Sequence, residues 1–212
     1  MKTSNKHLLI AVCSVFTASF LSCTKEPLNN LTQEESRIYV TNRDSTANFS
    51  NYTTYSISDS ADVLDNGQTH KELTAVDQAY IDAVNKYMQA KGYKLVSRNA
   101  NPDLGLNLNR IYNTATGYYS YNDYWDYYGG YWDPYYWGYG GYDYYVPYSF
   151  GVYQVTEGAV SVDMLDLKNA SAKGKIDIIW NGLIRGEGIF NASTANASVK
   201  ALFDQSTYLE SE

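Results

Sequence analysis

The stretch "SFGVYQVTEGAVSVDMLDL" at residues 149–167 has the pattern that decides the fold. It breaks at Glu157 and Gly158, and this break predicts two antiparallel strands joined as a hairpin. In the second strand, Asp163 is expected to point to solvent, away from the apolar face. The apolar alternation slips at Leu165, which indicates a bulge or the end of the strand. The residues expected to share the apolar face are Val160, Val162 and Met164.

Further strands are predicted on both sides of this stretch. Downstream, residues 176–184 alternate as one long strand with a single apolar face. Upstream, residues 104–108 alternate Leu with Gly or Asn, which predicts a strand buried on one face and ending near Tyr112. The apolar face of the downstream strand is expected to contain Ile176, Ile178, Trp180 and Ile184. Shorter β-branched or aromatic segments at 37–41, 52–58 and 93–97 predict three more strands.

Two helices are expected, one before the middle of the chain and one at its end. The first begins near Thr74, which forms a capping box with Asp77, and ends at Lys91-Gly92. Its apolar residues recur at steps of three and four, namely Leu73, Val76, Tyr80, Val84 and Tyr87. The second is a short helix within 197–209, with Val199, Leu202 and Phe203 on one side. Strands outnumber helices and hairpins link most neighbours, so we expect an α+β fold, an antiparallel-dominated sheet with helices packed on one face.

The N-terminus has the features of an export signal. Two lysines precede an apolar run at 8–20, which is shorter than the roughly 20 residues that span a bilayer as a helix. The sequence Phe20-Leu21-Ser22-Cys23 resembles the lipobox of bacterial lipoproteins, so residues 1–22 are interpreted as a signal peptide and Cys23 as the acylated N-terminus. A plain secretory signal with an incidental cysteine is the alternative. The only other cysteine, Cys13, lies in the signal, so the mature chain has no internal disulfide.

The rest of the chain divides into a tether and one domain. Residues 23–36 are polar and lack an apolar period, and residues 37–212 fit a single domain with an aromatic insertion at 113–148. Thr24 follows the cysteine where an Asp would favour inner-membrane retention, so we expect anchoring to the outer membrane, on its periplasmic face or at the cell surface. The net charge of −7 and the absence of a basic run in the mature chain argue against nucleic acid as a partner.

An ordered series of segments resembles one known family. The series is "NFSNYTTY" (48–55), "NPDLGLNL" (101–108), "EGAVSVDMLDL" (157–167), "IIWNGLIRGEG" (178–188) and "ALFDQSTYL" (201–209). Together with the lipobox, it resembles the DUF4136 lipoprotein family from about Arg37 to the end of the chain. The resemblance implies the α+β fold and an envelope location. It implies no activity, because the family is named for lacking an assigned one.

Enzyme signatures are weak. The mature chain has one histidine, His70, in a turn-like stretch with no visible catalytic partner. Asp163 and Asp166 are three residues apart, which puts them on opposite faces of a strand, with Asp166 at its end. Residues 185–188 lack the context of a phosphate loop. The loop acids Asp123, Asp126, Asp133 and Asp143 lack the spacing of calcium loops. We expect no enzymatic activity, no metal and no cofactor.

The segment 118–148 is the remaining local clue. It contains no Lys, Arg or His, and consists mostly of aromatic residues, Gly and Asp. Three interpretations stay open: aromatics that only cover one another and the sheet, a recognition surface for a glycan or envelope protein, or a self-associating tract. We expect it to lie outside the folding core. The candidate contact residues are Tyr124, Trp125, Tyr128, Trp132, Tyr135 and Trp137.

The sequence thus predicts a lipid-anchored, non-catalytic binding or structural module. The alternative is an envelope hydrolase that acts on glycans, with the aromatic segment as a lid. Two carboxylates about 5 to 9.5 Å apart beneath the segment would favour the hydrolase.

Overall fold

The structure is a computed structural model that describes residues 31–65, 68–112, 118–120, 133–148, 152–154 and 158–211, with 118–120 and 152–154 described by their backbone alone. The sheet strands are β1 (Ile38–Arg43), β2 (Thr54–Asp65), β3 (Gln68–Glu72), β4 (Lys94–Leu95), β5 (Leu104–Ile111), β7 (Tyr144–Tyr145), β9 (Ala159–Asp166) and β10 (Ile176–Arg185). The α-helices are α2 (Ala75–Ala90), α4 (Ala170–Lys173) and α5 (Ala192–Gln205). Three 3₁₀ turns are η1 (Phe49–Asn51), η2 (Arg98–Ala100) and η3 (Pro134–Trp137).

The main sheet is open and mostly antiparallel. Its strand order is β1-β10-β9-β5-β2-β3, with β4 paired to β2 and β7 paired to β10. The parallel pairs are β2 with β5, β2 with β4, and β10 with β7. The predicted α+β class with an antiparallel-dominated sheet is therefore confirmed.

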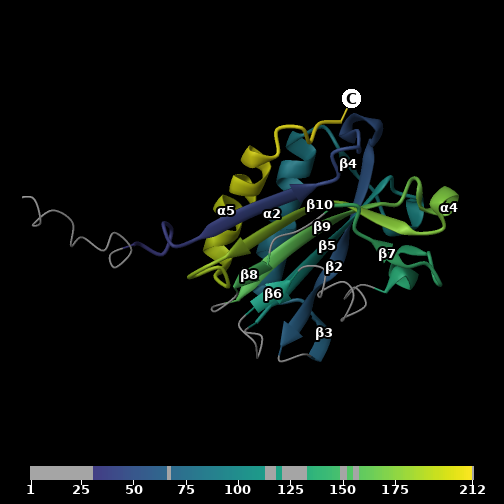
Figure 1. The fold of residues 1–212 in the computed structure, drawn as a ribbon. Helices are drawn as coiled ribbons and strands as arrows, with labels where there is room; N and C mark the ends of the chain where they lie inside the picture. The colour runs from purple at the N-terminus through teal and green to yellow at the C-terminus, as the bar shows by residue number, and fades with distance from the viewer. Residues whose placement is uncertain are drawn as a thin grey trace, which may run out of the picture.

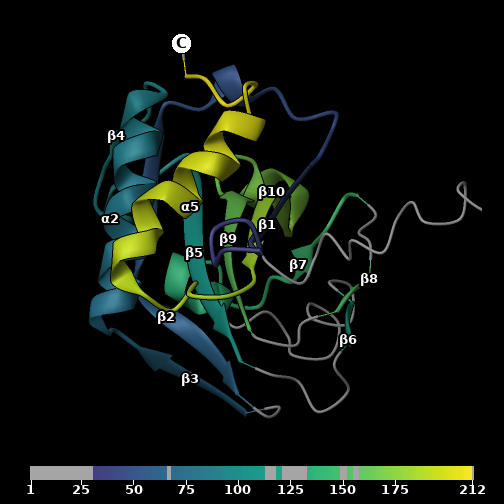
Figure 2. The same ribbon diagram turned by 90° about the vertical axis from the view of Figure 1, so that its left-hand side faces the viewer.

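Both faces of the sheet are covered (Figures 1 and 2). Helices α2 and α5 lie side by side across one face, where they bury the helix-side core around Tyr80, Val84, Trp180 and Leu202. The opposite face holds a second core, which includes Trp137, Leu165, Ile176 and Leu183. We call it the cap-side core, because aromatic residues of the segment 133–148 pack against it. All eight residues of β5 and all eight of β9 are buried. The prediction that β5 has one buried face is wrong, because a second layer covers its other side.

The first helix follows its local sequence signals. Thr74 caps α2 and forms the predicted reciprocal box with Asp77, and Gly92 beyond the C-terminal end has φ +91°. The capping-box prediction is confirmed. Leu73 precedes the cap and is 52% exposed, so its predicted place on the buried helix face is wrong. At this end of the helix, buried Arg110 of β5 pairs with Glu72, and its Nε lies 3.6 Å from Asp77.

The two central strands differ in one detail from the predicted faces. In β9, Val160, Val162 and Met164 share the helix side as predicted, while Leu165 faces the cap side without a register shift in the strand. The irregularity lies in β10, between Ile178 and Trp180. It puts Ile176 and Ile178 on the cap side and Trp180 and Ile184 on the helix side, so the prediction of one shared face is wrong.

Strand pairing also departs from the predicted hairpins. The short strand β8 (Val152–Gln154) pairs antiparallel with β6 (Tyr118–Ser120) in a second sheet, and β9 lies between β10 and β5. The predicted hairpin of β8 with β9 is therefore wrong. His70, expected in a turn, lies in the edge strand β3, which pairs with β2.

The first described residues hold one end of the sheet. Arg37 donates from Nε to the carbonyl oxygen of Glu187 at 3.0 Å, and Gly186 leaves room for the backbone of Ser36. This contact lies at the C-terminal end of β10, whereas α4 and β7 lie at the opposite end of that strand (Figure 1). No helix among the residues described is long and apolar enough to cross a membrane.

Candidate functional site

Residues 133–148, which we call the aromatic cap, lie against the sheet face opposite α2 and α5 (Figure 2). The cap begins with Asp133, whose Oδ1 accepts from the backbone N of Tyr135 at 2.9 Å and starts η3. Gly138 ends this turn with φ +85°, a conformation that favours glycine. The cap then pairs through β7 with the first residues of β10. The second half of the aromatic segment is thus built onto the sheet.

Trp137 joins the cap to the sheet. It is 6% exposed, and its Nε1 donates to Asn107 Oδ1 at 3.1 Å. Gly105 makes space for the indole, since a Cβ at that position would lie 3.2 Å from the ring and 3.0 Å from Leu167. Trp137 was predicted to be a candidate contact residue. The structure places its ring in the cap-side core instead.

Two tyrosines fasten the cap at its sides. The hydroxyl of Tyr139 donates to the carbonyl oxygen of Leu167 at 2.8 Å, and the hydroxyl of Tyr136 accepts from the backbone N of Asp59 at 3.1 Å. The guanidinium of Arg98 lies 4.2 Å from the centre of the Tyr136 ring. Burial raises the pKa of Tyr136, which keeps its hydroxyl neutral. The cap is therefore held by specific polar contacts as well as by apolar packing.

Two other tyrosines of the cap point outward. Tyr135 is 74% exposed, and its ring lies directly over Gly140, where a Cβ would approach to 2.2 Å. Tyr145 is 48% exposed, and the Nζ of Lys175 lies 3.3 Å from its ring centre. Of the predicted contact residues, Tyr135 is therefore available to a partner. Tyr124, Trp125, Tyr128 and Trp132 lie outside the described residues, as does Cys23.

A row of polar side chains crosses the sheet on the cap side. Asn42, Asn181, Asp163 and Asn107 are direct neighbours on β1, β10, β9 and β5. Asp163 has no solvent exposure, and its two oxygens accept from Asn181 Nδ2 at 2.7 Å and from Asn109 Nδ2 at 2.6 Å. The prediction that Asp163 faces solvent is wrong. Its side chain does point away from the helix-side core, as predicted, but the opposite face of the sheet is buried as well.

The cap also brings tyrosine hydroxyls toward this row. Burial is the main cause that raises the pKa of Tyr148, and the negative charge of Asp163 adds to it. Burial likewise raises the pKa of Tyr144, where the charges of Asp133 and Asp163 add to the effect. Both tyrosines are held in the neutral, hydrogen-bonding form. The row and its cover therefore form a polar layer inside the fold.

The acids of the "VDMLD" stretch do not form a catalytic pair. Asp163 lies on the cap side, and Asp166 lies on the opposite face at the end of β9, as predicted from their spacing. Asp166 accepts from Lys173 Nζ at 3.0 Å and from the backbone N of Asn169 at 3.1 Å. It holds the turn into α4. Within the described part of the chain, no group of three or more His, Cys, Asp or Glu residues is placed to hold a metal.

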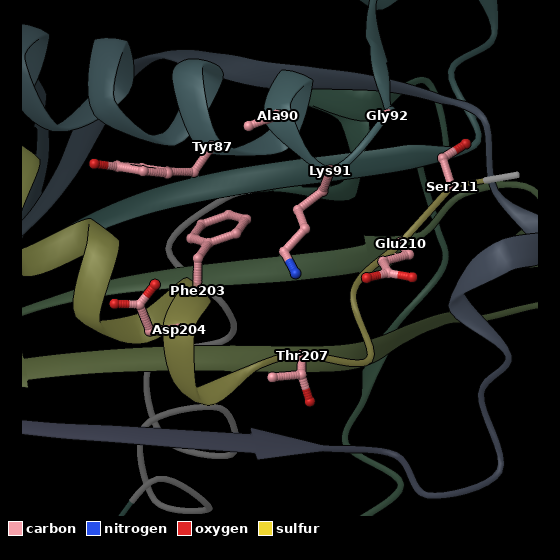
Figure 3. Close-up of a pocket in the computed structure, with 9 residues that line it drawn as sticks. All are labelled: Tyr87, Ala90, Lys91, Gly92, Phe203, Asp204, Thr207, Glu210 and Ser211. Atoms are coloured by element: carbon pink, nitrogen blue, oxygen red, sulfur yellow. The ribbon is translucent and has the colours of Figure 1, made fainter.

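An open groove of about 590 Å³ lies between the end of α2 and the C-terminal segment (Figure 3). The Lys91 amine extends between the Phe203 ring and the Glu210 carboxylate. Asp204 at its edge is bound to Lys200 at 2.6 Å. The backbone N of Ser211 donates to the carbonyl oxygen of Lys91 at 2.9 Å, which closes the groove at one end. The groove follows from the docking of the C-terminus on α2.

The fold and the cap define an α+β domain in which two helices cover one face of the sheet and the aromatic insertion is attached to the other. The model of a domain of unknown function, DUF4136, matches residues 39–206, so the chain belongs to the DUF4136 family. The family resemblance seen in the sequence is confirmed.

Solved structures include a relative of the same family. The crystal structure of a DUF4136 family protein from Bacteroides thetaiotaomicron VPI-5482 is 27% identical, with a TM-score of 0.71 over 84% of this chain and 99% of that one. A PDZ domain protein from Parabacteroides distasonis ATCC 8503 is 14% identical, with a TM-score of 0.42 over 82% of this chain and 36% of that one. No curated protein matches the chain.

Proposed function

We propose that this chain is a lipid-anchored envelope protein that binds a glycan or another envelope protein through its aromatic segment and catalyses no reaction. The anchor is an acylated Cys23 in the outer membrane, a proposal that rests on the lipobox-like sequence and the tether after it. The binding surface is formed by the outward rings of the aromatic segment.

The observation that most supports this role is the division of the cap into inward and outward rings. Trp137 and Tyr139 bind the sheet, whereas Tyr135 and Tyr145 expose large parts of their rings. Exposed aromatic rings on a fixed backbone offer contact area at low cost in conformational entropy, because the supporting chain is already ordered. A segment that only covered the sheet would not need to hold two rings outward.

The hydrolase alternative gains no support from the carboxylates beneath the cap. Both oxygens of Asp163 accept hydrogen bonds from asparagine amides, and Asp166 faces the other side of the sheet. A glycosidase needs two carboxyl groups across one bond. Asp163 and Asp166 are engaged in contacts that hold the fold, and the proposed binding role requires no reacting pair of carboxylates.

The test is capture from envelope extracts with the purified full-length protein. The double variant Tyr135→Ala/Tyr145→Ala removes the outward rings, and Leu73→Ala/Leu95→Ala removes two other exposed apolar side chains elsewhere. We expect the first variant to lose a partner, glycan or protein, that the wild type and the second variant retain. Sugar analysis and mass spectrometry identify the partner. Equal capture by all three proteins would contradict the proposal.

A further inference from the structure

A second concave site lies at the end of the sheet where β9 ends and β10 begins. This end pocket has a volume of about 430 Å³, within the range of small-molecule sites. Its floor includes the buried residues Tyr52, Asp166 and Ile179, and its rim includes the exposed Asn48 and Asn51. The aromatic cap lies on the other face of the sheet, so the two sites are separate.

Three sequence segments that are distant in the chain meet around this pocket. Asn48, Asn51 and Tyr52 come from the segment 48–55, and Asp166 and Lys168 come from the end of β9. Asp103, from "NPDLG", joins them by accepting from the backbone N of Thr53 at 2.8 Å and of Thr54 at 3.1 Å through its carboxylate. Backbone hydrogen bonds from these two residues lower the pKa of Asp103 against the opposing effect of its burial. The pocket is therefore built on a fixed frame.

Both lysines that line the pocket are already engaged, and the Asp44 carboxylate at the rim accepts from Thr46. Lys173 binds Asp166 at 3.0 Å and Asp177 at 2.6 Å. Lys168 donates to the carbonyl oxygen of Asn51 at 2.6 Å and lies 3.8 Å from Asp103. An anion entering the pocket would lose its hydration and find Lys168 and Lys173 already engaged, and a cation would find Asp166 already paired. A neutral ligand meets no such cost.

The remaining groups favour a ligand rich in hydroxyls. The Asn51 side chain offers both a donor and an acceptor. The Oδ1 of Asn48 already accepts from Ser50, which leaves its Nδ2 as a donor, and the Oδ1 of Asp44 accepts from Thr46, which leaves Oδ2 as an acceptor at the same rim. Tyr52, which is 5% exposed, closes the floor beside these polar groups, and its hydroxyl lies near Asp166. Burial of Tyr52, reinforced by the charge of Asp166, raises its pKa and keeps that hydroxyl neutral. Hydroxyl groups both donate and accept, so the hydroxyls of a saccharide match the amides and the carboxylate at this rim.

We propose that the end pocket binds a neutral saccharide unit through the rim amides of Asn48 and Asn51 and the floor formed by Tyr52. The proposal does not depend on the aromatic cap. Either site can be disabled without changing the residues of the other.

The experiment is calorimetric titration of the full-length protein with maltose, lactose and mannobiose as neutral probes, and with glucuronic acid and glucosamine as charged ones. At least one neutral probe should bind saturably, and the charged probes should bind at least tenfold more weakly. Asn51→Ala removes a rim amide but keeps the backbone oxygen that Lys168 uses, and it should weaken binding by about threefold to tenfold, the effect of one hydrogen bond.

The matched control is Asn196→Ala, which removes an exposed amide on α5, far from the pocket. Asn196→Ala and Tyr135→Ala/Tyr145→Ala should both bind the saccharide as the wild type does, and thermal melts should show that all variants fold. The proposal is overturned if no neutral probe binds, if a charged probe binds as tightly, or if Asn51→Ala leaves the affinity unchanged. The capture experiment on the cap variant has a separate readout, so failure of one proposal does not imply failure of the other.

Discussion

The carboxylate of Asp163 is fully buried and is held by asparagine amides on two neighbouring strands. A buried amide that loses its partner costs about 1–3 kcal/mol. Asp163→Ala leaves the Nδ2 groups of Asn109 and Asn181 without that acceptor, so the free energy of unfolding should fall by about 2–6 kcal/mol. Chemical denaturation measures the change. The control Asp204→Ala, which breaks an exposed pair with Lys200, should cost under about 1 kcal/mol; a similar small loss for Asp163→Ala would contradict the burial of this row.

Asp62 gives the fold a predicted dependence on pH. Burial raises its pKa to about 7, although the charge of Lys71 opposes this shift. The unfolded chain releases this proton near its ordinary pKa of 3.8, so between about pH 4 and pH 7 the folded state binds more protons than the unfolded state. The contribution of Asp62 to the free energy of unfolding is fully present below pH 4 and is lost as the pH rises toward 7.

The variant Asp62→Asn should lack this loss of stability at rising pH, because its side chain does not ionise. Compared with the wild type, the variant should have a smaller decrease in the free energy of unfolding between pH 4 and pH 8, measured by urea denaturation in steps of pH. An unchanged difference between the two pH values would show that Asp62 ionises normally in the folded protein.

Elements whose signals are local follow their sequence closely. Thr74, Asp77 and Gly92 define the ends of α2 through contacts within a few residues, and all three act as predicted. The bulge near Ile178 and the pairing of β8 with β6 depend on strands that are distant in the chain. Alternation alone also misleads for β5 and β9. Their polar side, with Asn107 and Asn109 on β5 and Ser161 and Asp163 on β9, is buried by a second layer, so a polar side does not mark a face exposed to solvent.

The sequence predicted which segment forms the candidate site, but not which of its aromatic rings are exposed and which are buried. Composition identifies the aromatic stretch, yet Tyr135 and Trp137 are two residues apart and have opposite exposures. The difference is decided by Gly105 and Asn107, which supply the space and the acceptor for one indole. No spacing within the segment itself contains that information.

The cap should contribute to stability as an element of the core. Trp137→Ala removes a buried indole and leaves the Oδ1 of Asn107 without its donor, so it should lower the free energy of unfolding by about 3–5 kcal/mol. Tyr135→Ala, on the same turn but exposed, should change it by less than about 0.5 kcal/mol. Thermal or chemical denaturation of both variants decides the matter. Equal and small effects of the two substitutions would contradict this claim and would show that the cap lies outside the folding core, as its composition predicted.

At the scale of the whole molecule, the contact made by residues 31–37 indicates which end of the domain lies nearest to the proposed lipid anchor. Residues 31–37 contact the loop at the C-terminal end of β10, while the cap and the end pocket lie at the N-terminal end of that strand. Ten residues of strand span about 30 Å. With a lipid at Cys23, the attachment leaves the domain at the end away from both proposed binding sites.

The anchor has a direct chemical test. Mass spectrometry of the membrane-extracted protein should find a mature chain that begins at Cys23 and contains added lipid. Cys23→Ala should leave the protein unprocessed or release it from the membrane, because a single residue provides the attachment. A mature chain that begins elsewhere, without lipid, would contradict the anchoring proposal.

The central claim is that the outward rings of the cap contact a partner in the native envelope, and side-chain footprinting measures this most directly. Intact envelopes and the purified full-length protein are labelled by hydroxyl radicals, and modification is read residue by residue by mass spectrometry. The account predicts that Tyr135 and Tyr145 are several-fold protected in the envelope, while Leu73 and Leu95, which are also exposed, react alike in both samples. Equal labelling of Tyr135 and Tyr145 in the two samples would contradict it.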